Sequence, residues 1–194
     1  MILAVEDSLT EILVKKILSE VRPDISNSII TLPLNGKSYL ESKARNLNRT
    51  AAGSPVFLFT DLDDRNDCPI NLILRWVPEP RHRNFLFRVV TMEIESWILG
   101  DRQAFSYFFS IPLNRIPQDT ESIDNPKGEI VSLARRSRKK QIREDVIPQF
   151  SGTAKVGPAY NACLSAFINE NWDINNALTS SESLRRAVDR IRNF

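Results

Sequence analysis

Four aspartates crowd the end of a short apolar segment. Residues 56–60 read VFLFT, which is typical of a buried strand, and four acids follow almost at once: Asp61, Asp63, Asp64 and Asp67. Like charges this close repel one another, so the arrangement costs free energy unless a cation or hydrogen-bond donors compensate. Two interpretations stay open: a solvated acidic loop, or a site for a divalent metal ion.

The elements around this segment are expected to alternate between strand and helix. Short apolar runs predict strands at 2–5, 28–32 and 56–60. Helical spacing of apolar residues predicts the intervening helices at 8–21 and 35–47. Ser8, with Glu11 three residues later, suits the start of the first helix as a capping box. The alternation predicts a parallel α/β sheet with crossover helices.

This topology should bring two acidic groups together. Ligands of open α/β sheets bind beyond the carboxyl ends of the strands. Glu6 and Asp7 follow the first predicted strand, and Asp61 and Asp63 follow the third. We therefore expect these side chains, distant in sequence, to be neighbours at one edge of the sheet.

The second half of the chain continues the pattern and then becomes helical. A fourth strand at 85–90 is also followed by acids, namely Glu93, Glu95 and Asp101. Of these, Glu95 either belongs to the site or caps the next helix, whereas the other two are expected to be solvated. Further helices are predicted at 102–109, at 160–169 and at 183–191, and NPKGEIVSLARRSRKK is expected to start a basic helix at Pro126. The domain prediction is an α/β core over 1–100 and a helical portion over 101–194 packed on that core.

Composition limits the class of protein and the class of metal. The 194 residues are 42% hydrophobic and 26% charged, with a net charge of +2, as in a soluble globular protein. One histidine and two distant cysteines cannot build a typical zinc site, so a metal here would be Mg²⁺ or Mn²⁺ on carboxylates. The unpaired cysteines, the absence of a signal-peptide pattern and the lack of a spanning apolar stretch predict a cytoplasmic, bacterial protein without a membrane partner.

A Glu after strand one and an Asp-x-Asp after strand three resemble the TOPRIM domain of topoisomerases, primases and OLD-type nucleases. Glu6 in LAVED, and Asp61 and Asp63 in TDLDD, carry the resemblance. It implies that the two aspartates bind Mg²⁺ or Mn²⁺, and that Glu6 binds metal or acts as acid and base. The sequence departs from the family pattern at Asp7, where a glycine is usual; the next acid is Glu11.

A narrower resemblance covers nearly the whole chain. IESWILGD, DNPKGEI and SSESLRR are similar to segments of small TOPRIM-like proteins encoded beside ABC-type ATPases in anti-phage defence loci. This resemblance implies that Glu95 is a further metal ligand and catalytic residue, and that Lys127 is a cation stabilising negative charge. It also implies an ABC-type ATPase partner and a metal-dependent nuclease activity in defence. As plain structural residues, Glu6 would favour a helix N-terminus, and Lys127 would be a surface lysine in a first turn.

A cluster of positive charge suggests how nucleic acid would be held. The run ARRSRKKQIR is not interrupted by any acid and includes Arg135, Arg136, Arg138, Lys139 and Lys140. Such a run is either a solvated face or a contact to the phosphate backbone that does not depend on base sequence. On the second interpretation the partner is nucleic acid, with DNA favoured over RNA. Arg185 and Arg186 form a smaller second candidate.

Two other functions remain open. The opening ILAVEDSLTEILVKKIL also resembles a response-regulator receiver domain, in which Glu6 and Asp7 would bind Mg²⁺ and Asp61 would be phosphorylated. However, the fourth strand leads into Thr91, Glu93 and Glu95, and no Lys-Pro appears where a receiver has one after its fifth strand. The other possibility is a TOPRIM-fold module that binds a partner ATPase without catalysis.

Overall fold

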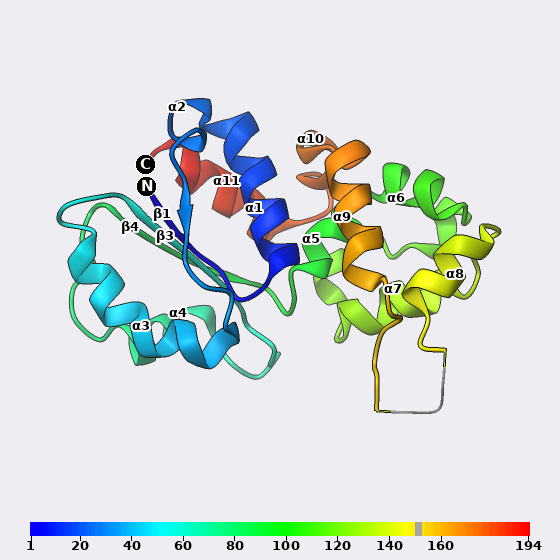
Figure 1. The fold of residues 1–194 in the computed structure, drawn as a ribbon, viewed down its shortest axis with the longest axis horizontal. Coiled ribbons are helices and arrows are strands. Elements are labelled where there is room, and N and C mark those ends of the chain that lie inside the picture. The colour runs from blue at the N-terminus through cyan, green and yellow to red at the C-terminus, as the bar shows by residue number, and fades with distance from the viewer. Residues whose placement is uncertain (150–152) are drawn as a thin grey trace. The chain divides into compact units, whose positions relative to one another are not determined.

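The computed structural model describes residues 1–149 and 153–194 (Figure 1). Its chain forms two compact units. Unit 1 comprises Met1–Thr91 together with Arg185–Phe194, and unit 2 comprises Met92–Leu184. In the described ranges, no helix is long and apolar enough to cross a membrane.

Unit 1 contains a four-stranded sheet in the order β2-β1-β3-β4, with every neighbouring pair parallel. Its strands are β1 (Ile2–Ala4), β2 (Ile30–Thr31), β3 (Val56–Asp61) and β4 (Phe85–Val90). The expectation of an α/β fold with a parallel sheet is confirmed. The two central strands, β1 and β3, are those that lead into the acidic segments.

Helices cover both faces of this sheet, as crossover connections require. They are α1 (Ser8–Val21), α2 (Pro23–Ser26), α3 (Gly36–Thr50), α4 (Pro69–Trp76) and α11 (Glu182–Arg192), of which α11 begins in unit 2. Helices α3 and α4 lie on one face, and α1 and α11 on the other (Figure 1). On this second face the Phe57 ring meets the edge of Phe194, with 4.6 Å between centroids.

The start of α1 differs from the expected capping box. Asp7, not Ser8, is the N-cap residue: its side chain accepts a hydrogen bond of 2.8 Å from the Thr10 backbone N–H. Glu11 instead pairs with Lys15 one turn later, at 2.6 Å. A carboxylate at the N-cap also interacts favourably with the helix dipole, so Asp7 has a structural role in starting α1.

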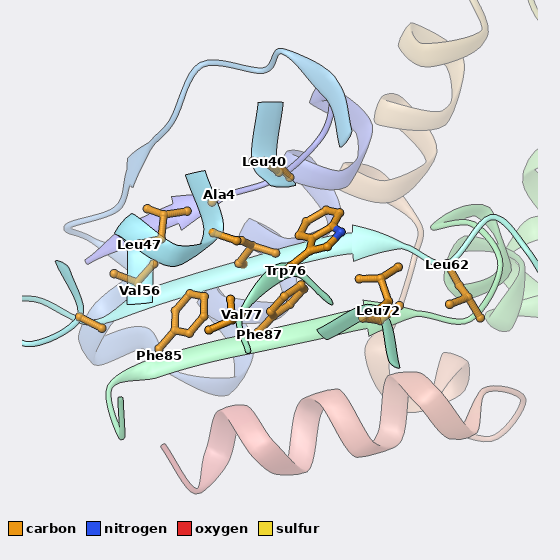
Figure 2. Close-up of a cluster of buried hydrophobic side chains, with 14 residues drawn as sticks. Ala4, Leu40, Leu47, Val56, Leu62, Leu72, Trp76, Val77, Phe85 and Phe87 are labelled. Carbon is orange, nitrogen blue, oxygen red and sulfur yellow. The ribbon is translucent and has the colours of Figure 1, made fainter. Parts of the chain in front are cut away.

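An apolar cluster between the sheet and helices α3 and α4 holds the strands in place (Figure 2). Trp76 from α4 packs against Phe87 from β4, with ring centroids 5.4 Å apart. Val56 and Leu58 from β3 are fully buried in the same cluster. Burial of this kind contributes about 1.5–3 kcal/mol for each large side chain, so the carboxyl ends of β1 and β3 are rigidly supported.

Unit 2 is mostly helical, which confirms the expectation for the C-terminal portion. Its helices are α5 (Glu95–Gly100), α6 (Arg102–Phe109), α7 (Pro126–Ala134), α8 (Lys140–Val146), α9 (Tyr160–Glu170) and α10 (Ile174–Ala177). Two short 3₁₀ turns are η1 (Leu113–Arg115) and η2 (Thr120–Ser122). The helix beginning at Pro126 was expected to contain the basic run, but it ends at Ala134, and most of the basic residues lie in the following loop.

The expectation that Asp101 is solvated is wrong. Its side chain is 0% exposed, and it caps α6 by accepting a hydrogen bond of 3.1 Å from the Ala104 N–H. Its second carboxylate oxygen accepts a hydrogen bond of 2.9 Å from the Asp173 N–H. Two backbone donors therefore satisfy this buried carboxylate, which ties α6 to the segment leading into α10.

Candidate functional site

Glu6 and Asp61 are held together at the carboxyl edge of the sheet in unit 1. Ala4 of β1 pairs with Leu58 of β3, so two residues further on Glu6 lies level with Thr60. The Glu6 Oε1 atom accepts a hydrogen bond of 3.0 Å from the Asp61 N–H and a short one from the Thr60 hydroxyl. The expected proximity of Glu6 to Asp61 is confirmed through the Asp61 backbone, whereas the Asp7 side chain caps α1.

The environment of Glu6 favours a carboxyl group that holds its proton more tightly than usual. Burial raises the pKa of Glu6 above its ordinary value of 4.5, and the negative charge of Asp63 adds to this effect. Hydrogen bonds from Thr60 and Asp61 and the charge of Lys37 act in the opposite direction but do not cancel the rise. A carboxylate with a raised pKa at a strand end is typical of acid–base sites.

A lysine that the sequence analysis did not single out lies at this edge. The Lys37 ammonium, near the start of α3, donates to the Asp63 carboxylate at 2.6 Å and to the Asp61 carbonyl oxygen at 2.7 Å. Gly36 positions it: the Gly36 N–H donates to the Glu6 carbonyl oxygen at 3.1 Å, with a φ of 75° that suits glycine. The only signal in the sequence was a Gly-Lys pair at the start of the helix predicted over 35–47.

Lys37 holds Asp63 in an unusual conformation. Asp63 is exposed and has a φ of 63°, in the left-handed region that aspartate tolerates better than most residues. An ammonium therefore supplies part of the positive charge that the acidic segment requires. The Oδ2 atom of Asp63 is thus already engaged by Lys37, and a divalent cation at that oxygen would compete with the ammonium.

The side chains at this edge suit a hard divalent cation in their chemistry, though not as a ready-made cage. Their oxygen donors are carboxylates, which Mg²⁺ and Mn²⁺ prefer. Across residues 1–149 and 153–194, no group of three or more His, Cys, Asp or Glu side chains is arranged to hold a metal ion. Mg²⁺ commonly uses one or two carboxylates together with water and substrate phosphates, and Glu6 with Asp61 would meet that requirement.

The other two predicted catalytic residues, Glu95 and Lys127, meet in unit 2. The Glu95 side chain is 1% exposed, and the Lys127 Nζ atom lies 3.5 Å from its Oε1 atom. Glu93 joins the cluster, because its Oε2 atom accepts a hydrogen bond of 2.9 Å from the Lys127 N–H at the start of α7. The Tyr160 hydroxyl from α9 donates to Glu95 at 3.1 Å. Nothing in the sequence pattern pointed to Tyr160.

Burial dominates the ionisation of Glu95. It raises the pKa of this carboxyl to about 6 from an ordinary value of 4.5; the Lys127 charge opposes the rise and the Glu93 charge adds to it. Between these two values the folded protein binds more protons than the unfolded chain does. The free energy of unfolding therefore falls as pH rises through this range.

We expect Glu95→Gln to remove this pH dependence. Glutamine keeps an oxygen to accept from Tyr160 but cannot ionise, so at pH 7 the variant should be more stable than wild type by about 2 kcal/mol. The stability difference should shrink to near zero below pH 4.5, where Glu95 is protonated in both states. Urea unfolding of both proteins across this range, in EDTA, measures the difference; a difference independent of pH would contradict the assignment.

The basic run forms an exposed loop between α7 and α8. Its five predicted nucleic-acid contacts are all exposed: Arg135, Arg136, Arg138, Lys139 and Lys140. Ser137 at its centre is buried, accepts a hydrogen bond of 3.0 Å from the Lys139 N–H, and donates to the Phe109 carbonyl oxygen. This anchor gives the loop a defined shape with its charges turned outward.

An aromatic side chain lies beside this loop. A cavity of about 440 Å³ is lined in part by Tyr107, Arg138 and Lys139. Tyr107 is 80% exposed, and the Lys139 ammonium lies 6.0 Å from the centre of its ring. An exposed ring next to cationic groups is the combination that single-stranded nucleic acid uses for base stacking and phosphate contact.

The predicted site residues thus form three groups. Glu6, Asp61 and Asp63 gather with Lys37 in unit 1, Glu95 and Lys127 gather in unit 2, and the basic loop belongs to unit 2. Comparisons with protein-family models, with curated proteins and with solved structures find no match to this chain.

Proposed function

We propose that this protein is a Mg²⁺- or Mn²⁺-dependent nuclease of the TOPRIM type, which hydrolyses phosphodiester bonds of nucleic acid, with DNA favoured over RNA. The observation that carries the proposal is the hydrogen bond from the Asp61 backbone N–H to the Glu6 carboxylate, which places both residues at the carboxyl edge of the two central strands. Parallel α/β sheets bind ligands at this edge. The charge of Asp63 also acts unfavourably on the Glu6 carboxylate there, and acidic groups gathered in this way are typical of cation sites rather than of a stable core.

Each residue of the acidic edge has a role in this proposal. When bound, the divalent ion would neutralise phosphate charge and lower the pKa of a water molecule. Asp61 and Asp63 would hold the ion, which would compete with Lys37 for the Asp63 carboxylate. Glu6 would help to hold it or take the proton from the attacking water, for which a raised pKa is suitable. Lys37, once released from Asp63, would remain available to contact a phosphate oxygen.

The residues of unit 2 keep the roles that the resemblance implies. Glu95 would be a further acidic ligand, and Lys127 would stabilise negative charge on the phosphate or the leaving oxygen. The Lys127 Nζ atom lies 3.5 Å from the Glu95 carboxylate, so the two charges compensate each other in the absence of substrate. The resemblance also implies an ABC-type ATPase partner and a role in anti-phage defence, which we retain as part of the proposal.

The receiver interpretation is less well supported. Asp7 would have to share a metal with Glu6, but its side chain caps α1. The sheet in the described residues has four strands, whereas a receiver needs a Lys-Pro pair after a fifth. A non-catalytic binding module remains the alternative, and the following assay separates it from an enzyme.

A cleavage assay tests the nuclease proposal. Supercoiled plasmid, linear duplex DNA, single-stranded DNA and transfer RNA are each incubated with the protein in Mg²⁺, Mn²⁺ or EDTA. We expect products in at least one metal and none in EDTA, and the substrate that is cut identifies the class of nucleic acid. Binding to nucleic acid without cleavage in either metal would favour the binding module.

The basic loop should contribute to affinity through its charges alone. Replacing Arg135, Arg136 and Arg138 together by glutamine should reduce the slope of log affinity against log salt by about three, because each phosphate contact contributes about one. Fluorescence anisotropy with a labelled DNA duplex in EDTA, at several salt concentrations, measures the slope.

A second triple variant controls for net charge. Lys43, Arg45 and Arg49 are exposed on α3, and their replacement by glutamine removes the same charge from another surface. We expect this control to keep a slope close to wild type. Equal slopes in the two triple variants would show that the loop is an ordinary solvated surface.

A further inference from the structure

A second charged site lies in unit 1, away from the acidic edge. A cavity of about 310 Å³ is lined by four arginines, here called the arginine pocket: Arg81, Arg83, Arg88 and Arg190. The remaining lining residues are His82, Phe85, Leu86 and Phe87, so no acid is among them. Arg81 and Arg83 precede β4, at the amino ends of the strands, whereas Glu6 and Asp61 lie at the carboxyl ends.

Arg88 forms the recessed part of this pocket. It lies within β4, where Phe87 and Val89 on either side of it in sequence belong to the apolar cluster on the α3–α4 face. By strand alternation Arg88 points to the opposite face, and its side chain is half-buried there. In the described structure its Nε–H is buried and has no hydrogen-bond partner. A buried donor without an acceptor costs about 1–3 kcal/mol, so this position favours an acceptor supplied from outside.

The charges around Arg88 point to the same conclusion. Burial lowers the pKa of Arg88, and the positive charges of Arg190, Arg186 and Arg81 lower it further. Like charges drawn together around a half-buried guanidinium are unfavourable in the absence of an anion. An anion in the pocket would reverse the sign of these interactions.

The loop that carries two of the arginines is held in a defined shape. Asn48 on α3 is buried. Its side-chain oxygen accepts a hydrogen bond of 2.8 Å from the His82 N–H, and its side-chain amide donates one of 3.1 Å to the Pro80 carbonyl oxygen. The His82 Nδ1 atom accepts a hydrogen bond of 3.1 Å from the Asn84 N–H. Neutral His82 therefore carries its proton on Nε2, where it is a further donor. These hydrogen bonds fix the backbone from which Arg81 and Arg83 extend.

The shape of the pocket selects among anions. Guanidinium groups match the oxygens of phosphate in paired hydrogen bonds. A phosphate within a nucleic-acid strand carries one negative charge. The strand continues on both sides of it, so this phosphate cannot easily reach the recessed Arg88 side chain. A terminal phosphate carries nearly two charges and projects from the end of its molecule. We propose that the arginine pocket binds a terminal phosphate group, as found on a nucleotide or on the 5′ end of a nucleic-acid strand.

Binding to two matched strands tests this proposal. Single-stranded DNA of about 12 nucleotides, labelled at its 3′ end, is prepared with either a 5′-phosphate or a 5′-hydroxyl, and anisotropy is measured in EDTA. We expect at least one of two results. The phosphorylated strand should bind at least about tenfold more tightly than its hydroxyl counterpart, or AMP and ATP should displace the labelled strand where adenosine does not. EDTA prevents metal-dependent cleavage, so the result is independent of the proposed nuclease activity.

Variants locate the effect and separate the two sources. Arg190→Ala, at an exposed position, and Arg88→Met should each remove the preference for the terminal phosphate, while Arg192→Ala should keep it. Arg192 is exposed on the same helix and lies 3.7 Å from Asp189, so it controls for charge on α11. Preference for the phosphorylated strand without competition by AMP or ATP would identify a strand end, and competition by them a nucleotide. No preference and no competition in wild type, or a preference that survives in both pocket variants, would overturn the proposal.

Discussion

Asp61→Asn should lower the rate of metal-dependent cleavage by at least about 100-fold. Asparagine has nearly the shape of aspartate but lacks the charge that would hold the divalent ion. The Asp61 backbone N–H that donates to Glu6 is unchanged by the substitution, so the partner carboxylate should keep its position. The variant should therefore lose cleavage activity while keeping its fold.

Initial rates on the substrate identified by the cleavage assay, together with a thermal melt of each protein, measure this effect. Asp64→Asn is the matched control: Asp64 is exposed three residues later, and its Oδ1 accepts from the Asn66 N–H, which an asparagine oxygen can still do. We expect the control to cut at close to the wild-type rate. Unimpaired cleavage by Asp61→Asn would exclude this acidic edge as the metal site.

Glu6→Gln should also reduce the rate, by about 100-fold if Glu6 takes the proton from water. Glutamine keeps an oxygen that accepts from the Asp61 N–H and from Thr60, so the contact between β1 and β3 is preserved. As a base, Glu6 must be ionised, and the wild-type rate should rise as pH rises through its pKa, which is raised above 4.5. The residual activity of the variant should lack this rise.

Rates across acidic to neutral pH, for wild type and for two variants, test the role of Glu6. Glu11→Gln is the control, because Glu11 is the other glutamate that follows β1 and its carboxylate pairs with Lys15 on α1. The control should retain the wild-type rate and pH profile. If Glu11→Gln lost activity and Glu6→Gln did not, the alignment of this sequence with the TOPRIM pattern would be wrong at that loop.

The elements of unit 1 could be predicted because local sequence and tertiary packing agree there. The helix expected at 8–21 is α1, and the strand expected at 85–90 is β4, each with the same bounds. Apolar runs bounded by Pro or Gly signal strands clearly when both faces of the sheet are covered. The shorter strand β2 was overestimated, since only Ile30–Thr31 pairs with β1.

The acidic edge could be predicted in position but not in detail. Strand order follows from connectivity, so the meeting of Glu6 and Asp61 could be expected from the sequence. The position of Lys37 could not be expected, because its contact with Asp63 depends on how α3 starts at Gly36, which has a positive φ. Tyr160 is similar: its hydrogen bond to Glu95 spans 65 residues and depends on packing within unit 2.

The basic run shows a different limit. Arg and Lys have good helix propensity, so a continuous helix after Pro126 was a reasonable prediction. The chain leaves the helix at Ala134 because the Ser137 hydroxyl bonds the backbone of Phe109 and Lys139, contacts that propensity does not include. Side-chain to backbone hydrogen bonds of serine compete with helix in this way.

The binding of Mn²⁺ tests the central claim most directly, since it requires neither a substrate nor a partner. Electron paramagnetic resonance measures unbound Mn²⁺ during titration of wild type, Asp61→Asn and Asp64→Asn. We predict saturable binding to wild type and Asp64→Asn, and an affinity at least about tenfold lower for Asp61→Asn. No binding by wild type, or equal affinity in all three proteins, would contradict the account.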